Sequence, residues 1–410
     1  MINSEMLKKY ANLSLSIGVN LQKNQILVVK SPVECADFTR ILVEEAYKKG
    51  ASEVVVLWND EQCTRLNYLY SPIEVLEDYP DWLRDSVLHY AKKGAAILSI
   101  SASNPELMKG IDPVKIAAAK KSASIATREF STRIMTNENP WSIISLPTKA
   151  WAMKVYPGIS PEEAINKLWE TIFSVVRVNE ADPVAAWETH KNNLIAKMNY
   201  LNKKNFKTLH FTNNLGTDLY VDLAVNHIWC GGAESSSAGI EFIANMPTEE
   251  IFTMPKRDGV HGKVVSSKPL NYGGALINNF ALEFKNGKVV SFEAEEGYDA
   301  LKGLVTTDEG AAHLGEVALV PFDSPISNSN TIFFNTLYDE NASCHLAFGK
   351  AYNLTIKGGK TMSTEELMAS GGNDSLVHVD FMIGTKDLNI TGIAFDGTET
   401  PIFTDGNWAF

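Results

Sequence analysis

Cysteine is scarce in this sequence and shows no pairing motif. The 410 residues contain four cysteines, Cys35, Cys63, Cys230 and Cys344, and no two of them are spaced as Cys-x-x-Cys. This pattern argues against a disulfide framework and against a zinc ribbon. We therefore expect the chain to work in a reducing compartment, the cytoplasm.

Long hydrophobic runs are also lacking. The apolar stretches 26–29 and 54–58 are far shorter than the roughly 20 residues that a membrane-spanning helix needs. Residues 1–9 carry charge where a secretory signal would have its apolar core. We expect neither a membrane span nor secretion.

Positive charge is in deficit as well. Lys and Arg together number 37 against 49 Asp and Glu, which gives a formal net charge of -12 at pH 7. Because nucleic acid binding depends on clustered Lys and Arg, we expect no nucleic acid partner. With 45% hydrophobic and 21% charged residues, the composition is that of a folded protein, and the length favours two domains.

The first half alternates short apolar runs with helical patterns. The run 26–29 precedes a helix-like stretch over 36–49 that Gly50 closes, and strands are expected at 53–57, near 95–100 and over 141–146. A helical pattern follows over 160–204, with a break at Pro183. This order is typical of a parallel sheet covered by helices, so we expect an α/β domain with a parallel sheet over residues 1–185.

Loops that bind nucleotide phosphates are missing from this first half. No G-x-G-x-x-G follows any expected strand, and Gly358-Gly359-Lys360-Thr361 has Leu354 where a P-loop requires glycine. We expect no nucleotide site. The N-terminal domain is expected instead to pack, to orient substrate or to support an oligomer.

The second half is rich in predicted strands. Residues 218–225 alternate apolar and polar side chains with period two, and further strands are expected at 240–244, 263–266, 282–284, 289–292, 331–334 and 388–393. Gly, Asn and Pro turns separate them. We therefore expect a β-rich α+β catalytic domain over residues 186–410.

The segment around His378 is the most suggestive for metal binding. Residues two apart in a strand face the same side, so His378 and Asp380 are expected to point together while their neighbours face a core. An imidazole nitrogen and a carboxylate oxygen suit one divalent cation. By chance, about one such His-x-acid pair is expected in a chain of this composition, so a surface ion pair is an equal alternative.

Three further segments offer acids or histidine near strand ends. The segment 338–349 contains Glu340 and His345, and its Cys344 is expected to be a buried thiol rather than a nucleophile. In 245–253, at most one of the adjacent acids Glu249 and Glu250 can reach a shared site. Glu316 lies in an apolar strand, and a buried carboxylate needs a partner that a metal would supply.

These segments together resemble the M29 family of metallo-aminopeptidases. The resemblance covers essentially the whole chain, and its carriers are residues 130–156, 245–253, 314–320, 323–328, 335–347 and 378–384. Motifs of this length are far more specific than a single His-x-Asp pair.

The family resemblance implies a role for each candidate site residue. It implies that Glu250 rather than Glu249 is a metal ligand, that Glu316 bridges two ions, and that His345, His378 and Asp380 complete the site. Glu340 lies in the family's active-site motif as a ligand or a proton carrier. Tyr352 resembles the family's active-site tyrosine, although its spacing alone favours a half-buried core aromatic.

The resemblance further implies a two-metal hydrolysis of the N-terminal residue from short peptides. Two divalent ions, zinc, cobalt or manganese, would activate a water molecule, Glu316 or Glu340 would carry its proton, and the Tyr352 hydroxyl would donate to the oxyanion. The partners implied are peptides with a free N-terminus and a second copy of the chain in a homodimer. A two-metal hydrolase of another class, such as a phosphoesterase using Lys256 and Arg257, and a non-enzymatic metal-binding dimer are the alternatives.

Overall fold

The computed structural model describes residues 3–272 and 275–410, which form two compact units. Unit 1 comprises the chain up to Lys191 together with Ala233–Pro247, and unit 2 comprises Asn192–Gly232 together with Thr248–Phe410. Helix α10 (Pro183–Lys204) begins in the first unit and ends in the second. The predicted division into domains 1–185 and 186–410, with catalysis assigned to the second, stays a prediction.

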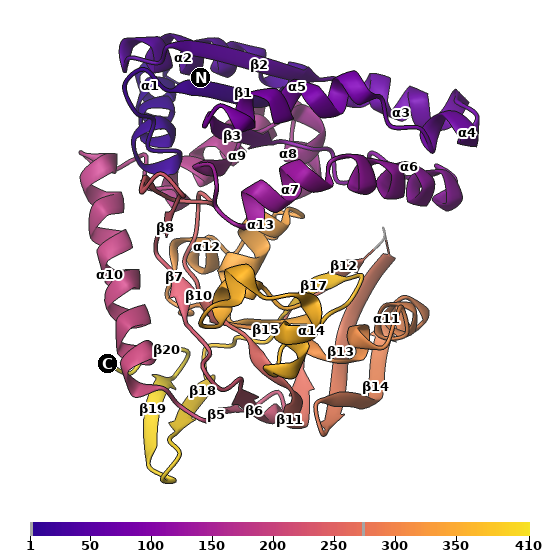
Figure 1. The fold of residues 1–410 in the computed structure, drawn as a ribbon, viewed down its shortest axis with the longest axis vertical. Coiled ribbons are helices and arrows are strands. Elements are labelled where there is room, and N and C mark those ends of the chain that lie inside the picture. The colour runs from indigo at the N-terminus through magenta and orange to yellow at the C-terminus, as the bar shows by residue number, and fades with distance from the viewer. Residues whose placement is uncertain (1–2, 273–274) are drawn as a thin grey trace. The chain divides into compact units, whose positions relative to one another are not determined.

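Unit 1, whose strands β1, β2 and β3 are labelled in Figure 1, is built on a parallel sheet in the order β2-β1-β3-β4. Central residues such as Val28 and Val29 of the first strand are fully buried, because strands flank them on both sides and helices cover the sheet. The strands agree with those predicted from the apolar runs: β1 (Ile26–Pro32), β2 (Glu53–Asn59), β3 (Ala96–Ser101) and β4 (Trp141–Ser145).

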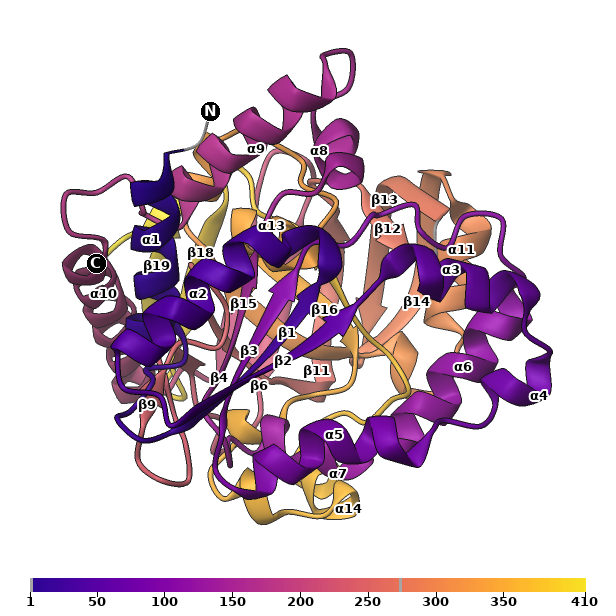
Figure 2. The ribbon, with the colours of Figure 1, turned by 90° about the horizontal axis from the view of Figure 1, so that it is seen from above.

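Helices pack on this sheet in the expected βαβ order. In the view of Figure 2, α2 and α5 lie on opposite sides of the strands. The predicted end of α2 is confirmed, since Gly50 adopts the left-handed φ of +98° that stops a helix. The helices are α1 (Ser4–Leu13), α2 (Ala36–Lys48), α3 (Glu61–Tyr70), α4 (Ile73–Leu76), α5 (Asp81–Lys92), α6 (Pro113–Ala126), α7 (Arg128–Met135), α8 (Lys149–Val155) and α9 (Pro161–Val175). The short pair β8 (Glu234–Ser235) and β9 (Glu241–Phe242) also belongs to this unit.

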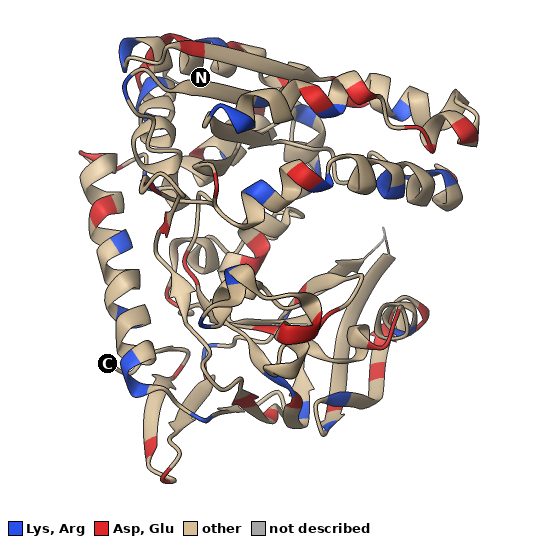
Figure 3. Ribbon diagram, in the orientation of Figure 1, with Lys and Arg blue, Asp and Glu red and all other residues tan. Residues whose placement is uncertain are grey.

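Helix α6 differs from the other long helices of unit 1. None of its residues is buried, and its charged residues are lysines, drawn in blue in Figure 3. By contrast, α9 buries Leu168, Ile172 and Phe173 and begins with a capping box at Ser160. Packing therefore stabilises α9 far more than α6.

Unit 2 contains two main antiparallel sheets. The smaller one has the order β17-β16-β15-β10-β7, with β7 (Cys230–Gly231), β10 (Ile251–Thr253), β15 (Leu314–Leu319), β16 (His345–Gly349) and β17 (His378–Met382). In the described residues the larger sheet has the order β12-β13-β11-β6-β5-β18-β19-β20, with β14 paired to β13. Its strands are β5 (Thr208–Thr212), β6 (Asp218–Leu223), β11 (Pro255–Val265), β12 (Leu270–Tyr272), β13 (Ala275–Lys285), β14 (Lys288–Glu296), β18 (Asn389–Ile393), β19 (Glu399–Thr404) and β20 (Asn407–Trp408).

The core of unit 2 joins these two sheets. Phe280 from the larger sheet lies with its ring centre 5.7 Å from that of Phe381 in the smaller one, and Phe348 lies 4.7 Å from Phe381. All three side chains are at most 1% exposed. The smaller sheet is thus held rigidly on one face by apolar packing.

Short helices complete the unit: α11 (Tyr298–Val305), α12 (Pro325–Asn328), α13 (Thr336–Asp339) and α14 (Thr364–Ala369).

One predicted strand, over residues 331–334, is wrong. Phe334 has a left-handed φ of +53°, which no strand residue of its size adopts readily. The Asp339 carboxylate stabilises this turn by accepting hydrogen bonds from the amides of Phe333, at 2.8 Å, and Asn335, at 3.0 Å. The apolar run therefore forms the approach to α13, and the strand predicted over 240–244 shrinks to β9.

No helix in residues 3–272 and 275–410 combines the length and apolar character that crossing a membrane requires.

Candidate metal centre

Neighbouring strands of the smaller sheet of unit 2 bring the predicted ligands together. Glu316 of β15 is paired with Ala347 of β16, and Ala347 is paired in turn with Asp380 of β17. Paired residues on adjacent strands share a face, so the two carboxylates lie on either side of a small alanine. The alternation of β17 also places His378 on the face of Asp380, as predicted from their spacing.

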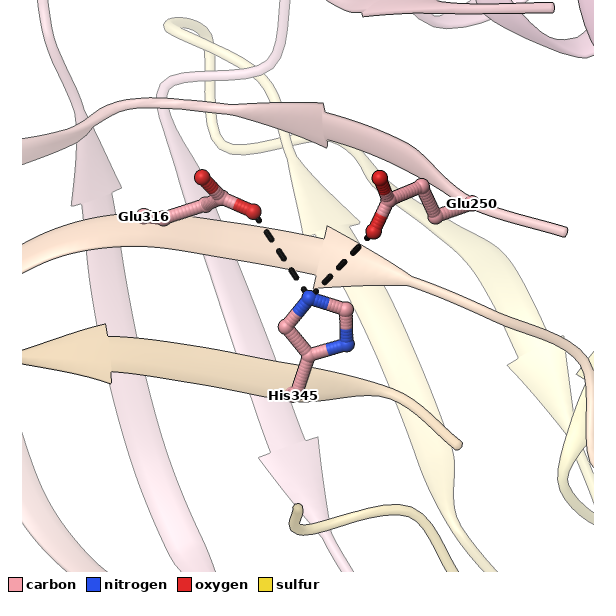
Figure 4. Close-up of side chains that lie close together, drawn as sticks. All are labelled: Glu250, Glu316 and His345. Atoms are coloured by element: carbon pink, nitrogen blue, oxygen red, sulfur yellow. Dashed lines mark ion pairs between the residues drawn. The ribbon is translucent and has the colours of Figure 1, made fainter. Parts of the chain in front are cut away.

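Glu250, Glu316 and His345 form one group of facing ligand atoms. His345 Nε2 lies 3.4 Å from a Glu250 carboxylate oxygen and 3.6 Å from Glu316 Oε1 (Figure 4). The His345 side chain is only 1% exposed, which keeps its ring in a single position at the start of β16. Such a cluster of one imidazole and two carboxylates is suited to a divalent cation.

Glu316, His378 and Asp380 form a second group. His378 Nε2 lies 3.6 Å from Glu316 Oε2 and 3.4 Å from Asp380 Oδ1. Glu316 is therefore common to both groups, and each of its two oxygens faces a different histidine.

Backbone carbonyls set the tautomer of both histidines. The Nδ1 atom of His345 lies 3.1 Å from the Ser343 carbonyl oxygen, and that of His378 lies 2.7 Å from the Lys350 carbonyl oxygen. A carbonyl can only accept, so each Nδ1 carries the proton and donates it. Each Nε2 then faces the carboxylate groups, as a proton donor while the ring is charged and as a free ligand atom once a cation replaces that proton, which is the arrangement of metal-binding histidines.

Burial and charge together perturb the carboxyl groups of this cluster. Burial raises the pKa of Glu316, and the nearby charges of Asp380 and Glu250 raise it further, against an opposing effect of His345 and His378. Burial also disfavours the protonated form of His378, but the nearby Asp380 carboxylate outweighs this effect and raises the pKa of the imidazole to about 9. So many buried charges are stable together only with compensating cations or protons.

The donor set fits a metal. Glu316 Oε2 and Asp380 Oδ1 are buried and face His378 Nε2, at 3.6 Å and 3.4 Å, but neither oxygen accepts a hydrogen bond from the residues that the structure describes. Leaving a buried carboxylate oxygen unsatisfied costs free energy that a bound cation would recover. Imidazole nitrogen and carboxylate oxygen are donors that zinc, cobalt and manganese all accept.

Glu340 and Tyr352 lie next to these groups without belonging to either of them within the described residues. Burial raises the pKa of Glu340 well above its usual value, and the charges of Glu250 and Asp380 raise it further. The Tyr352 ring centre lies 4.7 Å from that of His378, and burial followed by the charge of Glu316 raises the pKa of its hydroxyl. Their predicted catalytic roles stay predictions.

The structure separates the remaining sequence candidates from the centre. Cys344 is 1% exposed, its thiol lies 3.2 Å from the Val320 carbonyl oxygen, and burial raises its pKa to about 12, so it is a buried thiol as predicted. Glu249 is absent from both ligand groups in the described chain, although its neighbour Glu250 is present.

The basic pair at the start of β11 is occupied by acidic partners. The Lys256 ammonium lies 2.9 Å from Asp258, and Arg257 lies 2.9 Å from Glu309. Arg257 also donates to the Asn373 side-chain oxygen at 3.0 Å. A phosphate would have to displace these contacts, which weighs against the phosphoesterase alternative.

Sequence reasoning assigned no role to Asn341, which the structure places between two candidate ligand segments. Its side-chain oxygen accepts a hydrogen bond of 2.8 Å from the Glu249 amide, and its side chain is fully buried. A polar residue next to Glu340 in the motif 335–347 was the only signal in the sequence.

Comparison with known proteins identifies the family. The model of the thermophilic metalloprotease (M29) family matches residues 3–408. The chain belongs to the M29 metalloprotease family. This match, together with the aminopeptidases that the chain resembles, confirms its predicted enzyme class, a metallo-aminopeptidase that uses divalent metal.

Relatives of this M29 protein match it over nearly their whole length. Aminopeptidase AmpS of Bacillus subtilis is 51% identical over 407 residues, which cover 99% of each chain. Aminopeptidase T of Thermus thermophilus is 42% identical over 98% of each chain. The solved structure of wild-type AmpT from Thermus thermophilus superimposes with a TM-score of 0.93, covers 99% of both chains and confirms the predicted fold class.

Proposed function

We propose that this M29 protein removes the N-terminal residue from short peptides with a free amine, using two divalent ions at the centre in unit 2. The observation that carries the proposal is the position of Glu316, whose two oxygens face His345 and His378 separately. A carboxylate shared in this way is suited to bridging two cations a few ångströms apart.

Each group would supply its own donors. Glu250 and His345 would hold one ion, His378 and Asp380 the other, with Glu316 common to both and Glu340 as a further donor or a proton carrier. Two ions bound here would polarise the scissile carbonyl and increase the acidity of a water molecule.

The proton transfers fall to the chain's own carboxyl groups. Burial and the neighbouring acids raise the pKa of Glu340, which favours uptake of a proton by its carboxyl group. Glu316 is the alternative carrier. Either group would pass the proton to the amine that leaves when the peptide bond breaks.

The Tyr352 hydroxyl is suited to donate a hydrogen bond during the reaction. Burial and the charge of Glu316 raise its pKa, so the hydroxyl keeps its proton beside the carboxylates. Its ring packs 4.7 Å from the ring of His378 and 6.1 Å from that of Phe252, which fixes its position. Donation to the developing oxyanion would stabilise the transition state by a few kcal/mol, roughly as other such donors do.

A homodimer and a cytoplasmic location complete the proposal. Both rest on the sequence, the first on the family resemblance and the second on the scarcity of cysteine. The physiological metal is proposed as zinc, cobalt or manganese on the basis of the mixed nitrogen and oxygen donors.

Amino acid release from matched peptides tests the function. The full chain, stripped by a chelator, is assayed with and without added zinc, cobalt or manganese on unblocked peptides and on the same peptides N-acetylated. Metal-restored cleavage of only the unblocked set is expected. Cleavage of p-nitrophenyl phosphate instead would favour the phosphoesterase alternative, and binding of two ions without any hydrolysis would favour the non-enzymatic one.

A further inference from the structure

Asn341 connects two segments that are far apart in the sequence. Its Oδ1 atom accepts the amide N–H of Glu249, 92 residues away, at 2.8 Å. Its Nδ2 atom donates to the Leu337 carbonyl oxygen at 3.2 Å and lies 3.5 Å from Glu340 Oε1. One buried amide thus contacts the residue before Glu250 and the carboxylate of Glu340.

We infer that Asn341 is a positioning residue that holds Glu250 and Glu340 at the spacing required for metal binding. The inference rests on the proposed function of the centre, because it concerns residues that would bind or serve the ions. Neither contact makes Asn341 a ligand. Its effect on metal would act through the two glutamates that it holds in place.

Electrostatic repulsion explains why such a connection is needed. Asn341 contacts both the amide of Glu249, the residue before Glu250, and the carboxylate of Glu340, so the two acids lie near the same buried amide. Without a cation, like-charged carboxylates in a poorly solvated site push their loops apart. A neutral amide holds the loops together without adding another charge, and its donor end faces the Glu340 oxygen.

A purely local role does not account for all of these contacts. The bond to Leu337, four residues earlier, resembles an ordinary side-chain contact at the end of a short helix. The bond to Glu249 is different, because it ties α13 and the turn after it to the segment that enters β10. Glu249 is 4% exposed, so water cannot readily replace the lost acceptor.

Unit 1 offers a matched control. Asn139 is also fully buried, and its Nδ2 atom donates to the Ala91 and Ala95 carbonyl oxygens, both at 2.9 Å. Replacing either asparagine by leucine removes a buried amide while keeping a similar volume. Asn139 is remote from the ligand set in sequence and makes no contact with it among the described hydrogen bonds.

The test measures zinc affinity directly rather than activity. Chelator-stripped wild type, Asn341→Leu and Asn139→Leu compete for zinc with a chromogenic chelator, and apo-protein thermal unfolding is followed in parallel. We expect zinc affinity to fall about 10- to 100-fold for Asn341→Leu, as for other residues that orient ligands. Asn139→Leu is expected to bind zinc as wild type does, with a comparable loss of thermal stability.

Each other outcome overturns the inference. Unchanged zinc affinity in Asn341→Leu would show that the amide only satisfies the backbone, and equal losses in both variants would show a general effect of instability. If Asn341→Leu does not fold, Asn341→Ser, which admits water into the gap, is measured with the same expectation. Glu250→Gln separates the proposed metal centre from the positioning role of Asn341. Unchanged zinc affinity in Glu250→Gln would contradict the centre itself. Weaker zinc affinity in Glu250→Gln with unchanged affinity in Asn341→Leu would contradict only the positioning role.

Discussion

The parallel sheet of unit 1 and the smaller sheet of unit 2 are both buried, but they bury different chemistry. The buried polar side chains on the strands of unit 1 are hydroxyls, those of Ser31, Ser142 and Ser145. In unit 2, every residue of β15 is buried, Glu316 among them, and β16 begins with His345 at 1% exposure. A buried neutral hydroxyl costs little free energy even without a hydrogen bond, as at Ser142 and Ser145 within the described residues, whereas buried ionisable groups need a counter-charge.

This difference indicates that the two sheets have different roles. Apolar burial and hydroxyls make the first sheet a scaffold. The second sheet holds mutually repelling carboxylates in place through the apolar core on its other face, and a cation would balance their charge. Substitutions in the two sheets should therefore differ in kind as well as in size.

The largest effect is expected for Glu316→Gln. The amide oxygen of glutamine carries no charge and is a weaker metal ligand than a carboxylate oxygen. Both ligand groups contain Glu316, so both are weakened. Removing a residue that only hydrogen-bonds to a metal ligand costs up to roughly 100-fold in activity. We expect a larger loss of peptide hydrolysis for Glu316→Gln, together with fewer bound ions per chain. Metal content by elemental analysis and kcat/KM on an unblocked dipeptide check this; an active Glu316→Gln enzyme with full metal content would contradict it.

Tyr352→Phe should leave the metal in place and slow the reaction. Removing one oxyanion donor typically costs about 100- to 1,000-fold in kcat. We expect that loss with little change in KM and no change in zinc affinity, because the hydroxyl belongs to neither ligand group. Steady-state kinetics with a parallel zinc titration separate the two effects. An unchanged kcat would leave Tyr352 as a packing residue beside His378.

Leu98→Ala should show the opposite behaviour. Leu98 is fully buried in β3 of the parallel sheet, so the truncation leaves a cavity. We expect a loss of roughly 2–5 kcal/mol in the free energy of unfolding, measured with denaturant, and unchanged zinc affinity of the folded protein. Weakened zinc binding under conditions where the variant is folded would break the contrast between the two sheets.

The smallest effect is expected from pH at His227, a buried histidine outside the ligand groups of the described chain. Burial lowers its pKa below the usual 6.5, assisted by Lys357 and opposed by its bond to the Ala224 carbonyl. The unfolded chain therefore takes up a proton first as pH falls. The contribution of His227 to the free energy of unfolding is fully present above about pH 6.5 and is lost as pH falls below it. The loss amounts to roughly 1.4 kcal/mol for each unit by which the folded-state pKa is lowered.

Denaturant unfolding of wild type and His227→Gln between pH 7.5 and pH 5 measures this contribution as a difference. The wild type should lose more stability than the variant as pH falls. Parallel pH curves for the two proteins would show that burial does not penalise the charged ring.

Sequence periodicity predicted much of the fold because local patterns determined it. Three features illustrate this: the apolar run that ends at Val29, the glycine after α2, and the alternation of side chains around Asp380. Each is a pattern within a few residues of the chain. The turn at Phe334 escaped prediction, because an apolar run reads as a strand when the carboxylate that stabilises its left-handed backbone is several residues away.

Only part of the ligand set could be predicted from the sequence. Spacing alone paired His378 with Asp380, and the family resemblance was needed to choose Glu250 over Glu249. The contact of Asn341 with Glu249 had no local signal, because it spans 92 residues. Likewise, the return of residues 233–247 to unit 1 depends on long-range packing that no periodicity reveals.

The most direct test of the central claim is anomalous diffraction from zinc-loaded crystals of the full chain. The account predicts two anomalous peaks per chain, one beside His345 and one beside His378, each with a Glu316 oxygen at about 2.0–2.2 Å. A single peak, or two peaks that Glu316 does not touch, would contradict the shared carboxylate on which the proposed function rests.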